Sequence, residues 1–569
     1  MQTQRTDRVI RFTDFHPAHH FESFFFNVLL QHIPFRNESS LLSNNNVHKS
    51  YYIECCIRKL INTEDDIDTL VHEYCKLHFM MDENRQQLTN MIMQKAPIHG
   101  LDTPDPLHED ITNTDPHIHY TEKVFNLLNE LQEVKDASLN DEQQSIFNKL
   151  YETETGLHII TGTPGSGKTF LIKYIMYKEI SAGNTVVVTS TTGTSAARIS
   201  SIAKTAHQQF ALPRSRDLFR SPLQQTDARS LEIRHASVII IDEFSMLTNL
   251  AFHQIMLQIS NACNITLQSI RSQKKVIFFG DPGQLPAICE HTKRKNTEIC
   301  ESCHLLSSPF WTSGTFHKMT ISMRHVSDPE FCLFLNYIRE NQPSQEYIDN
   351  TLANTYISVP NLSNIINESI TVLCTHREDA NNYNYAILKN QFNDSDITEV
   401  GIESSAANED ELHYWVHDPE FTTIHNIAIG ALIMITENID LSIGACNGAL
   451  ATVISFEKNP STQKLTKINV HITISNRTIC IRRSKYSRIS HASKDYYRST
   501  FPIQLAYAIT GHKCQGATIK GKVLLVIRHA FAPGQIYVML SRVTTRKNLL
   551  ILNGLRKSNF IPIPKRFLY

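Results

Sequence analysis

The sequence lacks several features that define whole classes of protein. No apolar run in its 569 residues approaches the ~18 residues that a membrane span requires. The first twelve residues contain no apolar core of the kind found in secretion signals, and twelve cysteines are too few for a disulfide framework. The chain has no internal repeat and no low-complexity tract. We therefore expect a globular protein of a reducing, intracellular compartment, without a membrane partner.

Acidic residues are almost missing from the end of the chain. Between Lys458 and Tyr569 stand 21 Lys and Arg residues but only one acid, Asp495, which gives this block a formal charge of +20. The whole chain has a formal charge of −1, so the block stands against an acidic remainder. Such a block forms either a solvated charged face or a binding surface for a polyanion. The near absence of acids favours a nucleic-acid partner.

The pattern of apolar residues changes along the sequence. Residues 1–138 combine helical apolar spacing with a linker-like stretch over 96–116, which predicts a helical accessory region. After residue 138, short apolar runs alternate with helical patterns, which predicts an α/β fold with parallel sheets buried on both faces. Residues 427–497 carry short alternating strands with Gly and Asn turns, which predicts a small inserted all-β module.

Residues 162–169 form a complete phosphate-binding loop between a predicted strand, 157–160, and a predicted helix that stops at Gly183. Backbone N–H groups of such a loop wrap phosphates, and the helix N-terminus adds its positive end. We expect Lys168 to reach the β- and γ-phosphates and Thr169 to help hold Mg²⁺. The expected nucleotide-binding residues here are Gly162, Thr163, Pro164, Gly165, Ser166, Gly167, Lys168 and Thr169.

Two further motifs follow predicted strands. Asp242 and Glu243 end the apolar strand 238–241, at the edge where ligands bind in such sheets. We expect Asp242 to hold Mg²⁺ and Glu243 to position and polarise the attacking water. Gln284 follows the strand 276–279 in a turn rich in Gly and Pro. This glutamine either senses the γ-phosphate by hydrogen bonding or belongs to a plain turn.

The order of these motifs resembles that of the Pif-type (petite integration frequency) DNA helicases of superfamily 1B, relatives of RecD, including forms from viruses and Helitron-like transposons. The resemblance covers about residues 139–552 and is more specific than any single motif. The resembling segments are Leu139–Gln143, Thr189–Ala197, Thr205–His207, Asp242–Met246, Met323–Arg324, Phe501–Gly516 and Gly534–Val543.

The resemblance implies two RecA-like domains with ATP between them and a small Src-homology-3-like β-barrel inserted in the second. The expected domains are the helical region 1–138, a first ATPase domain 139–316, a second one of 317–426 and 501–569, and the barrel 427–500. The implied cofactors are ATP and Mg²⁺, and the implied partners are single-stranded and duplex DNA. The implied activity is 5′-to-3′ translocation and unwinding in replication, repair, recombination or telomere maintenance, in the nucleus or wherever DNA is replicated. An RNA helicase and an ATP-gated clamp that does not unwind are the alternatives.

The resemblance also assigns roles to single residues. Gln143 resembles the residue that reads adenine, while Arg324 and Arg542 resemble catalytic arginines that the second domain brings to the γ-phosphate. The expected catalytic residues are Lys168, Asp242, Glu243, Gln284, Arg324 and Arg542, and the expected DNA contacts are Thr192, Thr205, His207, His512 and Lys513. Three residues depart from the family pattern, namely Gly511, Cys514 and His325.

Two other patterns give only weak evidence for a functional site. Cys289, His291, Cys300, Cys303 and His304 cluster in the sequence, but only one pair has the CxxC spacing of zinc ligands. We therefore expect a loop of reduced thiols and no zinc. A His-x-His motif at residues 117–119 is similar to that of replication-initiator nucleases, but its linker-like surroundings predict no nuclease.

Overall fold

The computed structural model describes most of the chain after residue 123. The described residues are 124–212, 223–287, 299–401, 403–404, 426–489 and 495–568, with short stretches between 24 and 92. Most of the predicted accessory region 1–138 lies outside them, as do the linker 96–116 and the His-x-His motif at 117–119. Where that region is described, residues 67–72 and 124–130 are helical, and a short helix α6 follows over Gln132–Lys135.

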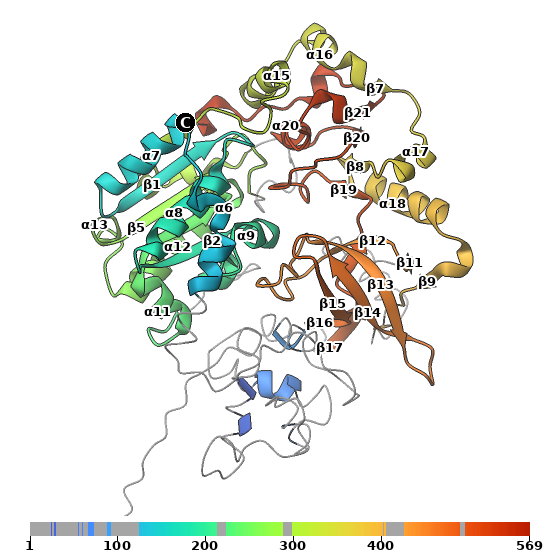
Figure 1. Cartoon of the computed structure of the whole chain (residues 1–569), viewed down its shortest axis with the longest axis horizontal. Helices are drawn as coiled ribbons and strands as arrows, with labels where there is room; N and C mark the ends of the chain where they lie inside the picture. The colour runs from blue at the N-terminus through green and yellow to red at the C-terminus, as the bar shows by residue number, and fades with distance from the viewer. Residues whose placement is uncertain are drawn as a thin grey trace, which may run out of the picture.

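A six-stranded parallel sheet organises the first lobe, which we define as residues 139–319 (Figure 1). Its strands run in the order β3-β2-β4-β5-β1-β6. Their bounds are β1 Gly156–Gly162, β2 Thr185–Ser190, β3 Lys204–Thr205, β4 Ala236–Asp242, β5 Lys275–Gly280 and β6 Thr315–Met319. The predicted strands 157–160, 238–241 and 276–279 thus lie within β1, β4 and β5.

Helices cover both faces of this sheet, which explains the continuous apolar runs of its strands. Alternate residues of β4 serve different cores, since Ile239 and Ile241 pack with one set of helices and Val238 and Ile240 with the other. The first set is α11 Ala228–His235, α12 Asn249–Cys263 and α13 Ile270–Gln273. The second set is α6 with α7 Asp141–Glu152, α8 Lys168–Ser181 and α9 Gly193–Ile199.

A five-stranded parallel sheet organises the second lobe, defined as residues 329–396 and 506–568. Its strands are ordered β19-β8-β20-β21-β7. Their bounds are β7 Tyr356–Ile357, β8 Thr371–Cys374, β19 Ala508–Thr510, β20 Val523–Val526 and β21 Leu549–Leu552. The lobe's helices are α15 Pro329–Glu340, α16 Gln345–Leu352, α17 Leu362–Asn367, α18 Arg377–Gln391 and α20 Gln535–Leu540. Both lobes are therefore α/β units with parallel sheets, as predicted.

The predicted small β module is antiparallel and lies beside both lobes (Figure 1). Its main sheet has the order β15-β14-β13-β12-β18. These strands are β12 Leu432–Ile435, β13 Leu450–Lys458, β14 Leu465–Ile472, β15 Arg477–Arg482 and β18 Ile503–Leu505. Two smaller sheets pair β11 Asn426–Ala428 with β9 Ile397–Glu399, and β17 Asp495–Thr500 with β16 Ser484–Ile489 and β10 Glu403–Ser404. The module's strands thus extend from 397 to 505, beyond the expected bounds 427–500.

The expected boundary between the ATPase domains at 316/317 is wrong. It falls inside β6, which pairs in parallel with β1 and so belongs to the first sheet. The sequence pattern did not indicate this strand, because β6 is an edge strand with several exposed residues and has no continuous apolar run. The chain leaves the first lobe only after Met319, and residues 320–328 connect it to α15.

Candidate nucleotide site and interdomain groove

The phosphate-binding loop joins β1 to α8 with the geometry that its sequence predicts. Gly165 and Gly167 have φ values of 84° and 86°, a left-handed conformation that glycine adopts without strain. Gly167 caps α8, which begins at Lys168. The Lys168 ammonium donates hydrogen bonds to the carbonyls of Gly162 at 2.7 Å and Thr163 at 3.1 Å. Burial lowers the pKa of Lys168, and the carboxylates of the site oppose that change.

The expected adenine-reading residue lies beside this loop. Gln143 and Asn140 form a reciprocal cap on α7, with N···O distances of 2.9 and 3.1 Å between each backbone amide and the partner's side chain. The Gln143 side-chain amide also packs directly over Gly167, leaving no room there for a Cβ atom. The cap therefore fixes the Gln143 amide at the start of α8.

The two expected acids lie at the end of β4, next to the loop. The Asp242 side chain is almost fully buried, and Ser195 Oγ donates a 3.2 Å hydrogen bond to its Oδ2. Burial and the neighbouring Glu243 raise the pKa of Asp242 to about 7, while Lys168 opposes this. Glu243 adopts a left-handed conformation with φ 58°. Two carboxylates this close are costly without a cation, so the pair is suited to a divalent metal ion.

Several buried polar atoms around the loop have no hydrogen-bond partner among the described residues. Buried polar atoms are almost always paired in folded proteins, so a cluster of unpaired ones indicates a ligand site. The unpaired atoms are Thr163 Oγ1, Ser166 Oγ, Asp242 Oδ1, Glu243 Oε2 and Gln284 Oε1. Hydroxyls, carboxylates and an amide are the groups that phosphates, Mg²⁺ and an attacking water would engage, so these residues fit a bound nucleotide with its metal ion.

Arg324 lies over the phosphate-binding loop and bridges the lobes. The amide of the preceding residue, Met323, donates a 2.7 Å hydrogen bond to the Gly165 carbonyl. The Arg324 guanidinium donates to the Ser541 carbonyl at 2.8 Å and to Thr518 Oγ1 at 2.6 Å, both in the second lobe. Arg324 thus comes from the connection between the lobes, and not from the second ATPase domain as expected.

Arg542 follows α20 on the second-lobe side of the same cleft and is 1% exposed. Its guanidinium donates to the carbonyls of Val538 at 2.9 Å and Ala517 at 3.0 Å, and to Ser541 Oγ at 2.8 Å. These acceptors are all neutral, so they hold the guanidinium in place without cancelling its charge. The expected role of Arg542 at the γ-phosphate stays a prediction.

A third guanidinium, which no sequence pattern indicated, belongs to this cluster. Arg198, near the end of α9, donates a hydrogen bond to the Gly516 carbonyl across the lobes. Burial, together with the charges of Arg542 and Arg198, lowers the pKa of Arg324 to about 9. Three clustered guanidiniums favour an anion between them. Arg198 directly follows the resembling segment 189–197, and no local pattern distinguishes it from a surface arginine.

Gln284 lies in the turn after β5 and is 2% exposed. Its Oε1 is one of the unpaired atoms given above. The described geometry therefore places Gln284 in a buried position that suits a ligand-sensing side chain more than a plain turn.

The three residues that depart from the family pattern have local compensations. Cys514 Sγ donates to the Gly511 carbonyl at 3.1 Å, and a Cβ atom on Gly511 would lie 3.0 Å from Met539 Cγ. Burial lowers the pKa of His325 to about 4, and its ring nitrogens lie 3.0 Å from both Ser322 Oγ and the Val543 carbonyl. At each position these contacts either fill the space or pair the polar group of the side chain.

The expected DNA contacts occupy two different places. The Thr192 and Thr205 hydroxyls cap α9 and α10 (Ala206–Gln209), so their hydrogen bonds serve these helices. His207 lies in α10 and is partly exposed. His512 and Lys513 instead line a groove between the lobes, and the groove's described lining does not include Thr192, Thr205 or His207. The structure therefore does not bring the five residues together.

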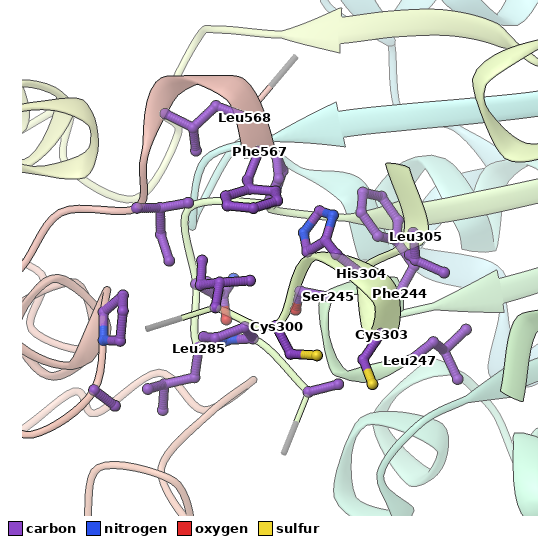
Figure 2. Close-up of a pocket in the computed structure, with 18 of the residues that line it drawn as sticks. Phe244, Ser245, Leu247, Leu285, Cys300, Cys303, His304, Leu305, Phe567 and Leu568 are labelled. Carbon is purple, nitrogen blue, oxygen red and sulfur yellow. The ribbon is translucent and has the colours of Figure 1, made fainter. Parts of the chain in front are cut away.

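The groove between the lobes has a volume of about 700 Å³ (Figure 2). One wall is apolar and includes Phe244, Leu285, Trp311 and Phe316 of the first lobe. The last described segment of the chain also lines the groove, where Phe567 lies beside His304 with ring centroids 4.6 Å apart (Figure 2).

The second-lobe residues that line this groove include two cations. These are Arg377 and Lys513, and the histidines His376 and His512 lie in the same lining. Burial and Arg377 lower the pKa of Lys513 to about 8, and the His512 ring stacks on Phe531 at 6.2 Å. A groove lined by both apolar side chains and cations suits the bases and phosphates of a single strand.

Acids of the same chain neutralise part of the basic C-terminal block. Five residues of the block form ion pairs with acids earlier in the chain, and a count of charges cannot reveal such pairs. These pairs are Lys467–Glu457, Lys522–Glu368, Arg528 with Glu378 and Asp379, Arg546 with Asp328 and Glu330, and Arg566–Glu301.

The cysteine cluster is only partly described. Cys289 and His291 lie outside the described residues, whereas Cys300 and Cys303 line the groove. Within the part of the chain that the structure describes, no group of three or more His, Cys, Asp or Glu side chains is placed to hold a metal ion. No helix in that part is long and apolar enough to cross a membrane. The absence of zinc stays a prediction.

The fold and this site define a P-loop ATPase with two RecA-like lobes. Within this class, residues 138–338 match the PIF1-like helicase family. The chain is 26% identical over 427 residues to "ATP-dependent DNA helicase Pif1" of Campylobacter jejuni, covering 70% of this chain and 89% of that protein. It is also 26% identical to "ATP-dependent DNA helicase PIF1" of Danio rerio, but it spans only 61% of that relative's length. In sequence, the chain thus resembles the Pif-type helicases of superfamily 1B, as predicted.

Solved structures agree with these relationships. A Pif1 structure described as a "Structural Basis for DNA Unwinding at Forked dsDNA by two coordinating Pif1 helicases" has a TM-score of 0.59 and 26% identity. "Bacteroides Pif1 bound to ssDNA" has a TM-score of 0.60 and 25% identity. Each similarity covers 75% of this chain and 95% of the solved chain. The RecA-like α/β core of the prediction is therefore confirmed.

Proposed function

We propose that this chain is an ATP-driven DNA helicase that moves 5′ to 3′ on a single strand and unwinds duplexes. The observation that carries the proposal is the position of Arg324. It lies on the phosphate-binding loop of the first lobe and donates to Ser541, the residue before Arg542, in the second lobe. A nucleotide bound at this loop would therefore be sensed by both lobes, as a two-lobed motor requires.

We propose that ATP binds in the loop 162–169 with its base near Gln143. Thr169 and Asp242 would hold Mg²⁺, which neutralises charge on the β- and γ-phosphates when bound. Glu243 would position and polarise the attacking water, and Gln284 would sense the γ-phosphate by hydrogen bonding. Lys168, Arg324 and Arg542 would stabilise charge on the γ-phosphate. The unpaired buried atoms around the loop support this assignment.

We propose that a single DNA strand follows the groove between the lobes. His512 and Lys513 would contact bases and phosphates there, while the segment of Thr192, Thr205 and His207 would contact the strand on the first lobe. Closing and opening of the ATP cleft then changes the distance between two gripping sites and moves the strand by steps. The relatives named above support DNA as the polymer.

The domain limits that we propose follow the sheets, with ATPase lobes over 139–319 and 329–396 plus 506–568, and an inserted Src-homology-3-like barrel over 397–505. Replication, repair, recombination or telomere maintenance is the proposed setting, in a reducing compartment such as the nucleus. A viral or Helitron-transposon source stays a prediction.

Strand displacement tests the proposal. Duplexes with a 5′ or a 3′ single-stranded tail are compared, each with DNA or RNA as the tailed strand. We expect ATP-dependent unwinding of the 5′-tailed DNA substrate alone. Equal activity on RNA tails would favour the RNA helicase, and stimulated ATP hydrolysis without unwinding on any tail would favour the clamp.

A further inference from the structure

Asp281 lies at the centre of a buried hydrogen-bond network that joins the two lobes. It follows β5 in the first lobe and is fully buried. Its Oδ1 accepts hydrogen bonds from the Gly283 amide at 2.9 Å and Arg339 Nε at 3.0 Å, and its Oδ2 accepts one from the Tyr537 hydroxyl at 2.8 Å. Arg339 and Tyr537 both belong to the second lobe. A first-lobe carboxylate thus has each of its oxygens bonded by the second lobe.

The turn that carries Asp281 is held between two helices of the second lobe. A Cβ atom on Gly283 would lie 2.5 Å from Arg339 Cγ of α15. A Cβ atom on Gly534, the N-cap of α20, would lie 2.8 Å from the Gly283 carbonyl oxygen. The backbone of the turn also fixes Gln284, whose amide donates to the Asp281 carbonyl at 3.0 Å. Any shift of these helices is therefore transmitted to Gln284.

The charge of this network makes it sensitive to the approach of the lobes. Arg339 is 6% exposed and also pairs with Glu340, which is adjacent on its own lobe. A buried carboxylate that loses its cationic partner is strongly destabilised, because neither water nor another group replaces the partner. Asp281 and its second-lobe donors come from different lobes, so the network is complete only when the lobes lie together. The same helix α20 leads directly to Arg542.

We propose that Asp281 is a positioning residue that couples the turn of Gln284 to helix α20, so that Gln284 and Arg542 reach the nucleotide together when the cleft closes. Asp281 acts through Tyr537 and Arg339. This inference rests on the proposed ATP-driven motor. It adds a link that ties the γ-phosphate-sensing turn to the opposite lobe.

Tyr537→Phe and Asp281→Asn test the link in the full chain. Removing one buried hydrogen bond of this kind should lower kcat for strand-stimulated ATP hydrolysis by about tenfold or more, while the KM for ATP changes by less than about threefold. The kcat of the double variant should lie within about twofold of the kcat of Asp281→Asn alone, since both changes break the same network. Arg339→Lys keeps the charge but loses the guanidinium geometry. Its kcat should therefore lie between that of the wild type and those of Tyr537→Phe and Asp281→Asn.

Tyr356→Phe is the matched control. Its hydroxyl donates to Asp349 at 3.3 Å, and both residues lie in the second lobe, so the variant removes a Tyr–Asp hydrogen bond that does not cross the cleft. We expect wild-type kcat. If Tyr537→Phe retains kcat within about twofold at unchanged Tm, the inference is wrong. Equal losses in ATP affinity and kcat would also overturn it, by showing a merely structural role. A wild-type protein without strand-stimulated hydrolysis would instead contradict the proposed function.

Discussion

The Arg324 guanidinium donates a 2.8 Å hydrogen bond to the carbonyl of Ser541, although the two residues are 217 positions apart. The first residue sits on the phosphate-binding loop and the second precedes Arg542. A carbonyl in this position orients the guanidinium but leaves it fully charged. The contact therefore holds two arginines at one cleft where a phosphate anion would relieve their repulsion.

Lys168→Ala should abolish ATP hydrolysis and leave single-strand binding within about threefold of wild type. In the proposed mechanism Lys168 binds the phosphates, whereas the interdomain groove binds the strand. The control is Lys173→Ala, on the same helix, which removes only a surface pair with Glu133. Turnover is measured with and without single-stranded DNA, and binding by fluorescence anisotropy. Stimulated hydrolysis in Lys168→Ala would show that the nucleotide site is elsewhere.

The pKa of about 7 for Asp242 predicts a pH dependence. A carboxyl whose folded pKa lies above its unfolded value holds a proton that the unfolded chain has already lost. Without Mg²⁺ and nucleotide, the stability contributed by this group should therefore fall as pH rises from about 4 to about 7. Asp242→Asn removes this cost, so at pH 8 it should raise the Tm of the nucleotide-free protein while abolishing hydrolysis.

Thermal unfolding at pH 5 and pH 8 checks this expectation. The Tm difference between Asp242→Asn and wild type should be larger at pH 8, because only there is the wild-type carboxylate charged and buried. A variant that is less stable than wild type at pH 8 would contradict the raised pKa. In the wild-type protein, Mg²⁺ should stabilise more at pH 8 than at pH 6, since the ion competes with the proton.

Single-strand binding should weaken steeply with salt. Neutralising Z phosphates gives a log–log slope of about −0.7Z, so several free Lys and Arg contacts predict a slope near −3 or steeper. Lys513→Ala should make the slope shallower by about 0.7, whereas Lys522→Ala should leave it unchanged because Lys522 pairs with Glu368. A flat titration would show that the basic block does not face nucleic acid.

Protein purified without chelator should contain well under one zinc per chain by elemental analysis. Only one CxxC pair is present, and its two residues, Cys300 and Cys303, line a largely apolar groove. The Cys300→Ser/Cys303→Ser variant should keep the wild-type Tm and metal content. Stoichiometric zinc that is lost in this variant would refute the expectation of a plain thiol loop.

Local patterns predicted most of the ATPase lobes but not the contacts between them. The apolar runs of β4 and β5 are continuous because helices cover both faces, and the loop around Lys168 is one contiguous motif. Asp281 has partners 58 and 256 positions away, which no spacing rule links to it. Edge strand β6 has no apolar run, so the domain boundary was placed inside it.

Arg542 provides the sharpest test of the closing cleft. It is buried on the second lobe, and its guanidinium is held by neutral acceptors, namely the carbonyls of Val538 and Ala517 and the Ser541 hydroxyl. An arginine that stabilises charge only in the transition state contributes ~10³–10⁵ in rate. Arg542→Ala should therefore keep ATP affinity nearly unchanged, lower kcat by at least about 10², and abolish unwinding.

The conservative and control variants separate this role from a structural one. Arg542→Lys should rescue poorly, because Lys lacks the planar fork that spans two phosphate oxygens. Arg546→Ala, four residues on, removes a cation that pairs with Asp328, at the end of the connection between the lobes, and with Glu330 of the second lobe, so it should keep kcat within about threefold. Nucleotide binding is followed by fluorescence titration alongside strand-stimulated turnover. Near-normal turnover in Arg542→Ala, at unchanged Tm, would rule out two-lobe closure as the source of catalysis, because no other second-lobe arginine among the described residues lies beside Arg324 in this cluster.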